Sequence, residues 1–239
     1  MLAFREAEPI VRRYFGEGFN TYLLHYSVLD NGGDPSSFHP LMDASLAIQY
    51  VREHAKEDHT DPHNVYIIGF SAGGHLAGSA GVLWNHPAAR AACGIDCGKA
   101  PEGINRPDGM ILCYPVITTG EYTHLGSTHR LCGNSNPSAE ERAQFSLERH
   151  VDDTTPPAFL WHTTTDSVVP IQNSILMMNA LAEHKIPFEA HIFPFGPHGT
   201  ALANEEGSYV SPSTLIPHIQ CWMDLSIKWM RMMIKKQNT

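Results

Sequence analysis

The feature that most constrains this chain is the segment 69–75, G-F-S-A-G-G-H. It follows the apolar run 65–68 (V-Y-I-I) and leads into the small-residue stretch 76–84 (L-A-G-S-A-G-V-L-W), a context that predicts a strand, a sharp turn and a helix. G-x-S-x-G in that context is typical of a nucleophile elbow, with a serine at the apex of the turn. We therefore predict a strained backbone at Ser71 and a hydroxyl raised above the edge of a sheet.

Two glycines and one amide belong to the same prediction. Side chains two residues before and after the serine would collide across such a turn, so Gly69 and Gly73 are expected where only hydrogen fits. A helix beginning directly after Ser71 would direct the backbone N–H of Ala72 toward an oxyanion. The alternative interpretation is a glycine-rich strand-to-helix loop without chemistry.

Composition restricts the partners. The 239 residues carry a formal charge of -9 at pH 7. Phosphate binding needs a basic surface, so no nucleic-acid partner is expected. No run of about eighteen apolar residues occurs, so no membrane partner or span is predicted. Residues 1–8 lack the basic-then-apolar order of a signal peptide, which favours a cytoplasmic protein.

Cysteine and histidine patterns predict neither a disulfide framework nor a metal site. The cysteines are Cys93, Cys97, Cys113, Cys132 and Cys221. Their odd number and wide scatter favour free thiols in a reducing compartment, with a Cys93–Cys97 bridge as the alternative. The histidines at 54, 59 and 63 lie near two aspartates, but their spacing matches no H-E-x-x-H or similar ligand set. We therefore predict no metal and no other cofactor.

Hydrophobic periodicity predicts alternating strands and helices. The predicted strands are 20–28, 64–69, 109–116, 158–163 and 187–193, and the predicted helices are 4–15, 41–56, 171–184 and 214–236. This alternation indicates one α/β domain, residues 1–239, built on a doubly wound, mostly parallel sheet. The polar, irregular segment 118–150 is a candidate lid or substrate loop within it.

Three polar residues fall at the carboxyl ends of predicted strands, where parallel sheets gather their chemistry: Ser71, Asp166 and His198. His198 would accept the serine proton and return it to the leaving alcohol, while Asp166 would orient the imidazole and stabilise its charged form. Asp166 as a turn cap, and Asp152 or Asp153 as the acid, are the alternatives. The histidines inside predicted elements are expected to pack or to support the site: His75, His162 and His191.

Several segments together resemble a known family. They are 69–77 (G-F-S-A-G-G-H-L-A), 155–170 (T-P-P-A-F-L-W-H-T-T-T-D-S-V-V-P), 195–199 (F-G-P-H-G), 6–10 (E-A-E-P-I) and 26–28 (Y-S-V). The chain resembles, over nearly its whole length, the α/β-hydrolase esterases of the acetyl-xylan and feruloyl esterase type. The resemblance implies removal of acetyl or other small acyl groups from a small-molecule or oligosaccharide ester. It also implies that Ser71, Asp166 and His198 are nucleophile, acid and base.

One family feature is absent from the sequence. The family carries a Gly-rich H-G-G-G or P-G-G-G-Y segment before its first helix, which supplies the other half of the oxyanion hole. Because no such motif occurs here, we expect an N-terminally shortened form of a longer esterase, without that loop and the strands preceding it. Strand 20–28 would then either pair with strand 64–69 or leave a gap. A signal peptide lost with the same segment would change the expected location.

Three functions follow from the sequence. The first is a serine esterase that deacetylates sugars or xylo-oligosaccharides. The second is a serine peptidase of the prolyl oligopeptidase type, which shares the triad order and the elbow but has a propeller domain that this sequence lacks. The third is a truncated, catalytically silent hydrolase-fold protein. The acyl group, the sugar and the oligomeric state are left open, and a homo-oligomer is compatible with the sequence.

Overall fold

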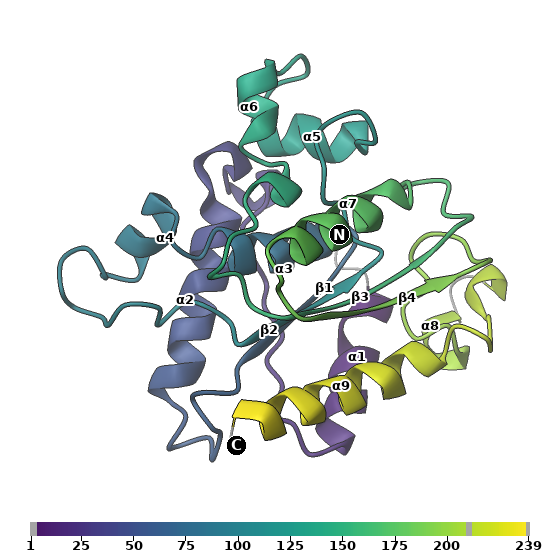
Figure 1. Cartoon of the computed structure of the whole chain (residues 1–239), viewed down its shortest axis with the longest axis horizontal. Helices are drawn as coiled ribbons and strands as arrows, with labels where there is room; N and C mark the ends of the chain where they lie inside the picture. The colour runs from purple at the N-terminus through teal and green to yellow at the C-terminus, as the bar shows by residue number, and fades with distance from the viewer. Residues whose placement is uncertain (1–3, 209–211, 238–239) are drawn as a thin grey trace.

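Four parallel strands form the sheet around which the chain is arranged (Figure 1). The computed structural model describes residues 4–208 and 212–237. Within these ranges the strands are β1 Tyr66–Phe70, β2 Gly109–Cys113, β3 Ala158–Thr163 and β4 Phe188–Phe193, in the order β1-β2-β3-β4. Leu112 lies opposite both Gly69 and Leu160, and Leu160 lies opposite Ala190. Every strand therefore ends at the same edge of the sheet.

The two inner strands are buried at every position, as their continuous apolar sequences require in a sheet covered on both faces. Helices α2 His39–Glu53, α3 Ala72–Val82 and α7 Gln172–Glu183 cover one face, and α1 Glu8–Gly16 and α9 Cys221–Gln237 cover the other (Figure 1). Successive β2 residues alternate between the two cores, with Leu112 in the first and Ile111 in the second. The doubly wound parallel architecture predicted from the sequence is confirmed.

Shorter elements occupy the connections. The short α-helices are α4 Pro87–Ala92, α5 Leu125–Cys132, α6 Ala139–Ala143 and α8 Glu205–Ser208, and the 3-10 helices are η1 Phe4–Glu6, η2 Leu29–Asn31, η3 Pro35–Ser37, η4 Leu147–Arg149 and η5 Pro212–Thr214. The segment 118–150 is therefore not irregular throughout, since it contains α5, α6 and η4. Ser138 and Glu141 form a capping box at the start of α6, a local signal for a helix that hydrophobic periodicity does not carry.

The predicted strand at 20–28 is wrong. These residues form no strand in the structure, and β1 is left at the edge of the sheet. Their amides turn to nearby side chains instead: the Ser27 N–H donates to Asp43, and the Val28 N–H donates to Asn31. Apolar and β-branched composition favours a strand only when a neighbouring strand completes the hydrogen-bond ladder. The sequence left open whether residues 20–28 pair with the strand at 64–69 or leave a gap. In the structure they are not paired with it.

The final helix also differs from its prediction. It begins at Cys221 rather than at 214, because η5 and a further turn precede it and Pro217 interrupts the helical pattern. Its two tryptophans, Trp222 and Trp229, are buried in the core beneath the sheet, as expected from their spacing. No helix within the described ranges is long and apolar enough to cross a bilayer.

Candidate active site

The elbow (residues 69–73) places Ser71 between β1 and α3. Its backbone has φ 52° and ψ -117°, a strained conformation for a residue with a side chain. Two hydrogen bonds to the last residue of β2 and the segment after it hold it: the Ser71 N–H donates to the Cys113 carbonyl (3.0 Å), and the Val116 N–H donates to the Ser71 carbonyl (3.1 Å). Because Ala72 is the first residue of α3, its N–H lacks a partner within the helix and is available to an anion.

The positions at the elbow where only a glycine fits differ from those expected. A Cβ atom at Gly69 would lie 2.0 Å from the Gly73 carbonyl oxygen, so only hydrogen fits there. A Cβ atom at Gly73 would meet only the Tyr26 hydroxyl, at 4.0 Å, which is an ordinary contact. The second tight position is Gly74, where a Cβ atom would lie 2.8 Å from that of Pro115. The collision expected at Gly73 is therefore absent.

Ser71, His198 and Asp166 form a continuous hydrogen-bonded chain. The Nε2 atom of His198 is 2.7 Å from the Ser71 hydroxyl oxygen, and its Nδ1 atom is 2.6 Å from Oδ2 of Asp166. The three residues follow β1, β4 and β3, whose carboxyl ends meet at one edge of the sheet. The Asp166 side chain is 1% exposed and that of His198 is 15% exposed. The Nδ1–H of His198 donates to the carboxylate, leaving Nε2 to accept the serine proton.

The surroundings of Asp166 favour its ionised form. Burial alone would raise the pKa of this carboxyl, but hydrogen bonds from His162, His198 and the Val169 amide outweigh burial and hold the pKa well below its usual value. Oδ1 accepts from the amides of Val168 and Val169, both at 2.9 Å. The rival acids are engaged elsewhere, Asp152 with its neighbour Thr154 and Asp153 with His184.

The histidines inside secondary structure surround the site or lie apart from it. His162, fully buried, has Nε2 3.1 Å from the Val169 carbonyl and 3.3 Å from Oδ2 of Asp166. Its other nitrogen lies 2.8 Å from the Ser174 hydroxyl. His75 is buried in α3 and bonds the Phe145 carbonyl, whereas His191 pairs with Glu189 on β4.

Tyr114 is a site residue that the sequence did not reveal. It is 2% exposed, has φ 36°, and presents its ring edge-on to that of His198 at a centroid distance of 5.0 Å. Its hydroxyl donates a hydrogen bond to Oε1 of Glu6 (2.7 Å) and accepts one from the Ala201 N–H (3.1 Å). Tyr114 thereby joins the N-terminal segment to the loop that carries His198. The only sequence signal for Glu6 was its place in E-A-E-P-I.

The segment 118–150 contributes a further histidine near the three residues. Burial lowers the pKa of His124, and the charge of His198 lowers it further while that of Asp166 opposes this effect. His124 caps α5 by accepting the Ser127 N–H. The start of α5 therefore lies within electrostatic range of His198 and Asp166.

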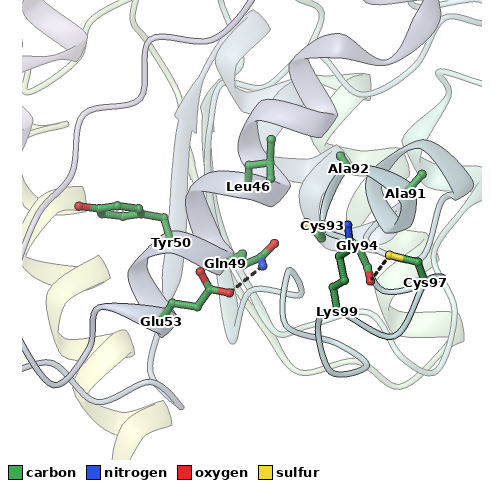
Figure 2. Close-up of a pocket in the computed structure, with 10 residues that line it drawn as sticks. All are labelled: Leu46, Gln49, Tyr50, Glu53, Ala91, Ala92, Cys93, Gly94, Cys97 and Lys99. Atoms are coloured by element: carbon green, nitrogen blue, oxygen red, sulfur yellow. Dashed lines mark hydrogen bonds between the residues drawn. The ribbon is translucent and has the colours of Figure 1, made fainter.

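An open cavity of about 540 Å³ lies between α2 and residues 91–99. Figure 2 shows the side chains that line it. Glu53, Lys99 and Cys97 are among its lining side chains, and Nε2 of Gln49 donates to Glu53 one turn further along α2. Neither the elbow nor His198 contributes to it, so this cavity is separate from the candidate active site. All five cysteines are free thiols. Within the described ranges no group of three or more His, Cys, Asp or Glu side chains could hold a metal ion.

Comparison with known proteins identifies the family. The sequence model of the BD-FAE family matches residues 4–104, and that of the prolyl oligopeptidase family matches residues 113–212. An acetyl ester-xyloside bifunctional hydrolase from Caldicellulosiruptor lactoaceticus is 34% identical in sequence and superposes with a TM-score of 0.78, over 95% of this chain and 76% of that one. The chain belongs to the α/β-hydrolase esterases. The family that the sequence resembled is thereby confirmed.

Two curated relatives of this chain are longer proteins. Endo-1,4-beta-xylanase B of Butyrivibrio fibrisolvens is 42% identical over 211 residues, which are 86% of this chain and 31% of that protein. An acetylxylan esterase of Xylanibacter ruminicola is 29% identical over 164 residues, which are 67% of this chain and 31% of that protein. The chain therefore spans about a third of the length of these relatives.

Proposed function

We propose that this α/β-hydrolase esterase cleaves carboxylic esters with Ser71 as nucleophile, His198 as general base and acid, and Asp166 as the supporting acid. The observation that carries the proposal is the unbroken chain of 2.7 Å and 2.6 Å contacts from the serine hydroxyl to the buried carboxylate. A serine hydroxyl is a weak nucleophile at neutral pH, and an imidazole held at that distance removes its proton during attack.

Acylation follows from this geometry. Nε2 of His198 takes the Ser71 proton as Oγ attacks the acyl carbon, and the resulting oxyanion accepts the Ala72 N–H. The imidazolium is stabilised by Asp166, whose depressed pKa keeps it ionised at neutral pH. As the tetrahedral intermediate collapses, the Nε2–H donates to the leaving alcohol, and the acyl group stays on Oγ.

Deacylation repeats the same steps with water as the nucleophile. Nε2 takes a proton from a water molecule as the water oxygen attacks the acyl carbon. Nε2 then returns that proton to Ser71 Oγ as the carboxylic acid departs. One histidine thus transfers protons in both halves of the reaction. General acid–base catalysis of this kind raises the rate by about 10² to 10⁴.

For the substrate we favour acetylated sugars or xylo-oligosaccharides. One relative is named an acetylxylan esterase, and a solved relative is named an acetyl ester-xyloside bifunctional hydrolase. The match of residues 113–212 to the prolyl oligopeptidase family supports a second candidate, a serine peptidase, because that range contains both Asp166 and His198. For the location we favour the cytoplasm, since five free thiols suit a reducing compartment.

Turnover of p-nitrophenyl acetate tests the proposal. We expect steady-state hydrolysis by the purified chain and a loss of at least about 10³-fold in kcat for Ser71→Ala. Ser135→Ala, at an exposed turn with no role in the site, is the matched control and should keep full activity. An inactive wild-type chain would indicate the silent hydrolase-fold protein instead. Comparing acetylated xylotriose with a prolyl peptide amide then separates the esterase from the peptidase.

A further inference from the structure

Two polar atoms near the proposed triad make no hydrogen bond to any described residue: Oε2 of Glu6 and the hydroxyl of Tyr26. Glu6 uses only its other carboxylate oxygen, to accept from Tyr114. Both side chains are half-buried, so these two atoms are partly removed from water without a partner in the described part of the chain. Polar groups held in this way are available to a ligand.

Both groups lie near the proposed triad, Tyr26 beside the elbow and Glu6 bonded to the tyrosine that packs on His198. The Tyr26 hydroxyl would stand 4.0 Å from a Cβ atom on Gly73, two residues after the proposed nucleophile. The negative charge of Glu6 acts on the Tyr26 hydroxyl, and the charge of His198 acts on Glu6. The carboxylate therefore lies within electrostatic range of both the tyrosine and the proposed base.

The rest of the structure holds the carboxylate in place. Tyr114, which donates to Oε1 of Glu6, is buried and packed against the His198 ring. Arg5, adjacent to Glu6, packs against the residue after the histidine: a Cβ atom on Gly199 would lie 2.7 Å from its Nη2 atom. An acceptor fixed by a buried neighbour binds a ligand with little loss of side-chain entropy.

We propose that Glu6 and Tyr26 form a binding subsite for the hydroxyl groups of the alcohol part of the ester, which is a polyhydroxylated sugar. A carboxylate oxygen accepts from one sugar hydroxyl, and the phenolic O–H can donate to or accept from a neighbouring one. The inference rests on the proposed function in one respect, namely that the ester is attacked at Ser71. An aryl acetate has no hydroxyl on its alcohol side and cannot use this subsite.

The test compares two substrates. Glu6→Gln keeps an oxygen acceptor for Tyr114 but removes the charge, and Tyr26→Phe removes only the hydroxyl. For acetylated xylotriose we expect each change to raise KM about tenfold with kcat largely retained. The ratio of kcat/KM for acetylated xylotriose to that for p-nitrophenyl acetate should fall by about the same factor. Tyr22→Phe is the matched control, because the Tyr22 hydroxyl bonds Asp58 away from the elbow, and its ratio should stay that of the wild type.

Binding of unacetylated xylotriose, followed by calorimetry, separates this inference from the proposed function because it needs no catalysis. We expect Glu6→Gln and Tyr26→Phe to weaken it about tenfold, including in a Ser71→Ala background. Unchanged binding, or equal losses on both ester substrates, would overturn the subsite and leave Glu6 a positioning residue for His198. Weakened binding in a chain that hydrolyses neither ester would support the subsite and contradict the esterase proposal.

Discussion

Nε2 of His162 lies 3.3 Å from Oδ2 of Asp166, the oxygen that also accepts from His198. Both side chains are almost completely buried, His162 on β3 and Asp166 three residues after its end. The carboxylate is therefore held by the strand that precedes it as well as by the histidine that it supports. Such outer contacts fix the orientation of a catalytic group, because a buried carboxylate without them would reorient or protonate.

Replacing His162 should thus impair catalysis without removing any proposed reacting group. We expect His162→Phe to lower kcat for p-nitrophenyl acetate about tenfold and the free energy of unfolding by about 2 kcal/mol, because the Ser174 hydroxyl and the Val169 carbonyl lose their partner. Steady-state kinetics and urea denaturation measure the two effects. His191→Phe, on the neighbouring strand, is the control, and equal kinetic losses in both variants would refute a specific role for His162.

His75 makes stability depend on pH. Burial lowers its pKa to about 4, below the value of about 6.5 expected in the unfolded chain. Because the folded pKa is the lower one, its contribution to stability is fully present above pH 6.5 or so and is lost as the pH falls through the folded pKa. We expect the free energy of unfolding to decline by about 3 kcal/mol more between pH 7 and pH 4 in the wild type than in His75→Gln.

Urea denaturation at a series of pH values measures this difference. The exposed His25 provides the control, since His25→Gln should keep the wild-type decline. A His75→Gln variant whose stability falls as steeply as that of the wild type would show that His75 is not the buried titrating group.

The two elbow glycines should respond differently to the same substitution. Gly69→Ala places a methyl group 2.0 Å from the Gly73 carbonyl oxygen, which must displace backbone, so we expect a loss of at least about 3 kcal/mol in the free energy of unfolding. Gly73→Ala meets only the Tyr26 hydroxyl at 4.0 Å and should change stability by less than about 1 kcal/mol. Thermal unfolding distinguishes them, and equal destabilisation would contradict the steric account.

Tyr114 should link stability to catalysis. Tyr114→Phe removes the donor to Glu6 and the acceptor of the Ala201 N–H, leaving that amide buried without a partner. We expect a loss of about 1 to 3 kcal/mol in the free energy of unfolding and a lower kcat, because the Ala201 amide belongs to the loop that carries His198. Urea denaturation and p-nitrophenyl acetate kinetics provide the two readouts. A Tyr114→Phe variant with wild-type stability would show that the two hydrogen bonds contribute nothing net.

The parts of the site that were predictable are those with local signals. The turn at Ser71 is predicted by a strand, a serine between glycines and a helix within twenty residues. Asp166 and His198 each follow a recognisable strand, and the topology of a parallel sheet brings strand ends together whatever their separation in sequence. The geometry that joins these three residues therefore follows from short-range patterns and one general rule.

The parts that were missed depend on contacts between distant segments. Residues 20–28 have strand composition, yet within the described ranges they pair with no strand, and no local pattern reports the absence of a neighbouring strand. Tyr114 reaches Glu6 across 108 positions, and Tyr26 approaches Gly73 only because the chain folds back over the elbow. Such proximity is a property of packing, so composition and periodicity leave it unspecified.

The most direct test of the account is chemical trapping of the acyl-enzyme. The chain would be mixed with p-nitrophenyl acetate, quenched in acid within the first turnover, and examined by peptide mass spectrometry. We predict one acetyl group per chain, on the hydroxyl of Ser71, and none in Ser71→Ala. An acetyl group on another residue, or turnover without any acetylated intermediate, would contradict the assignment of Ser71 as the nucleophile.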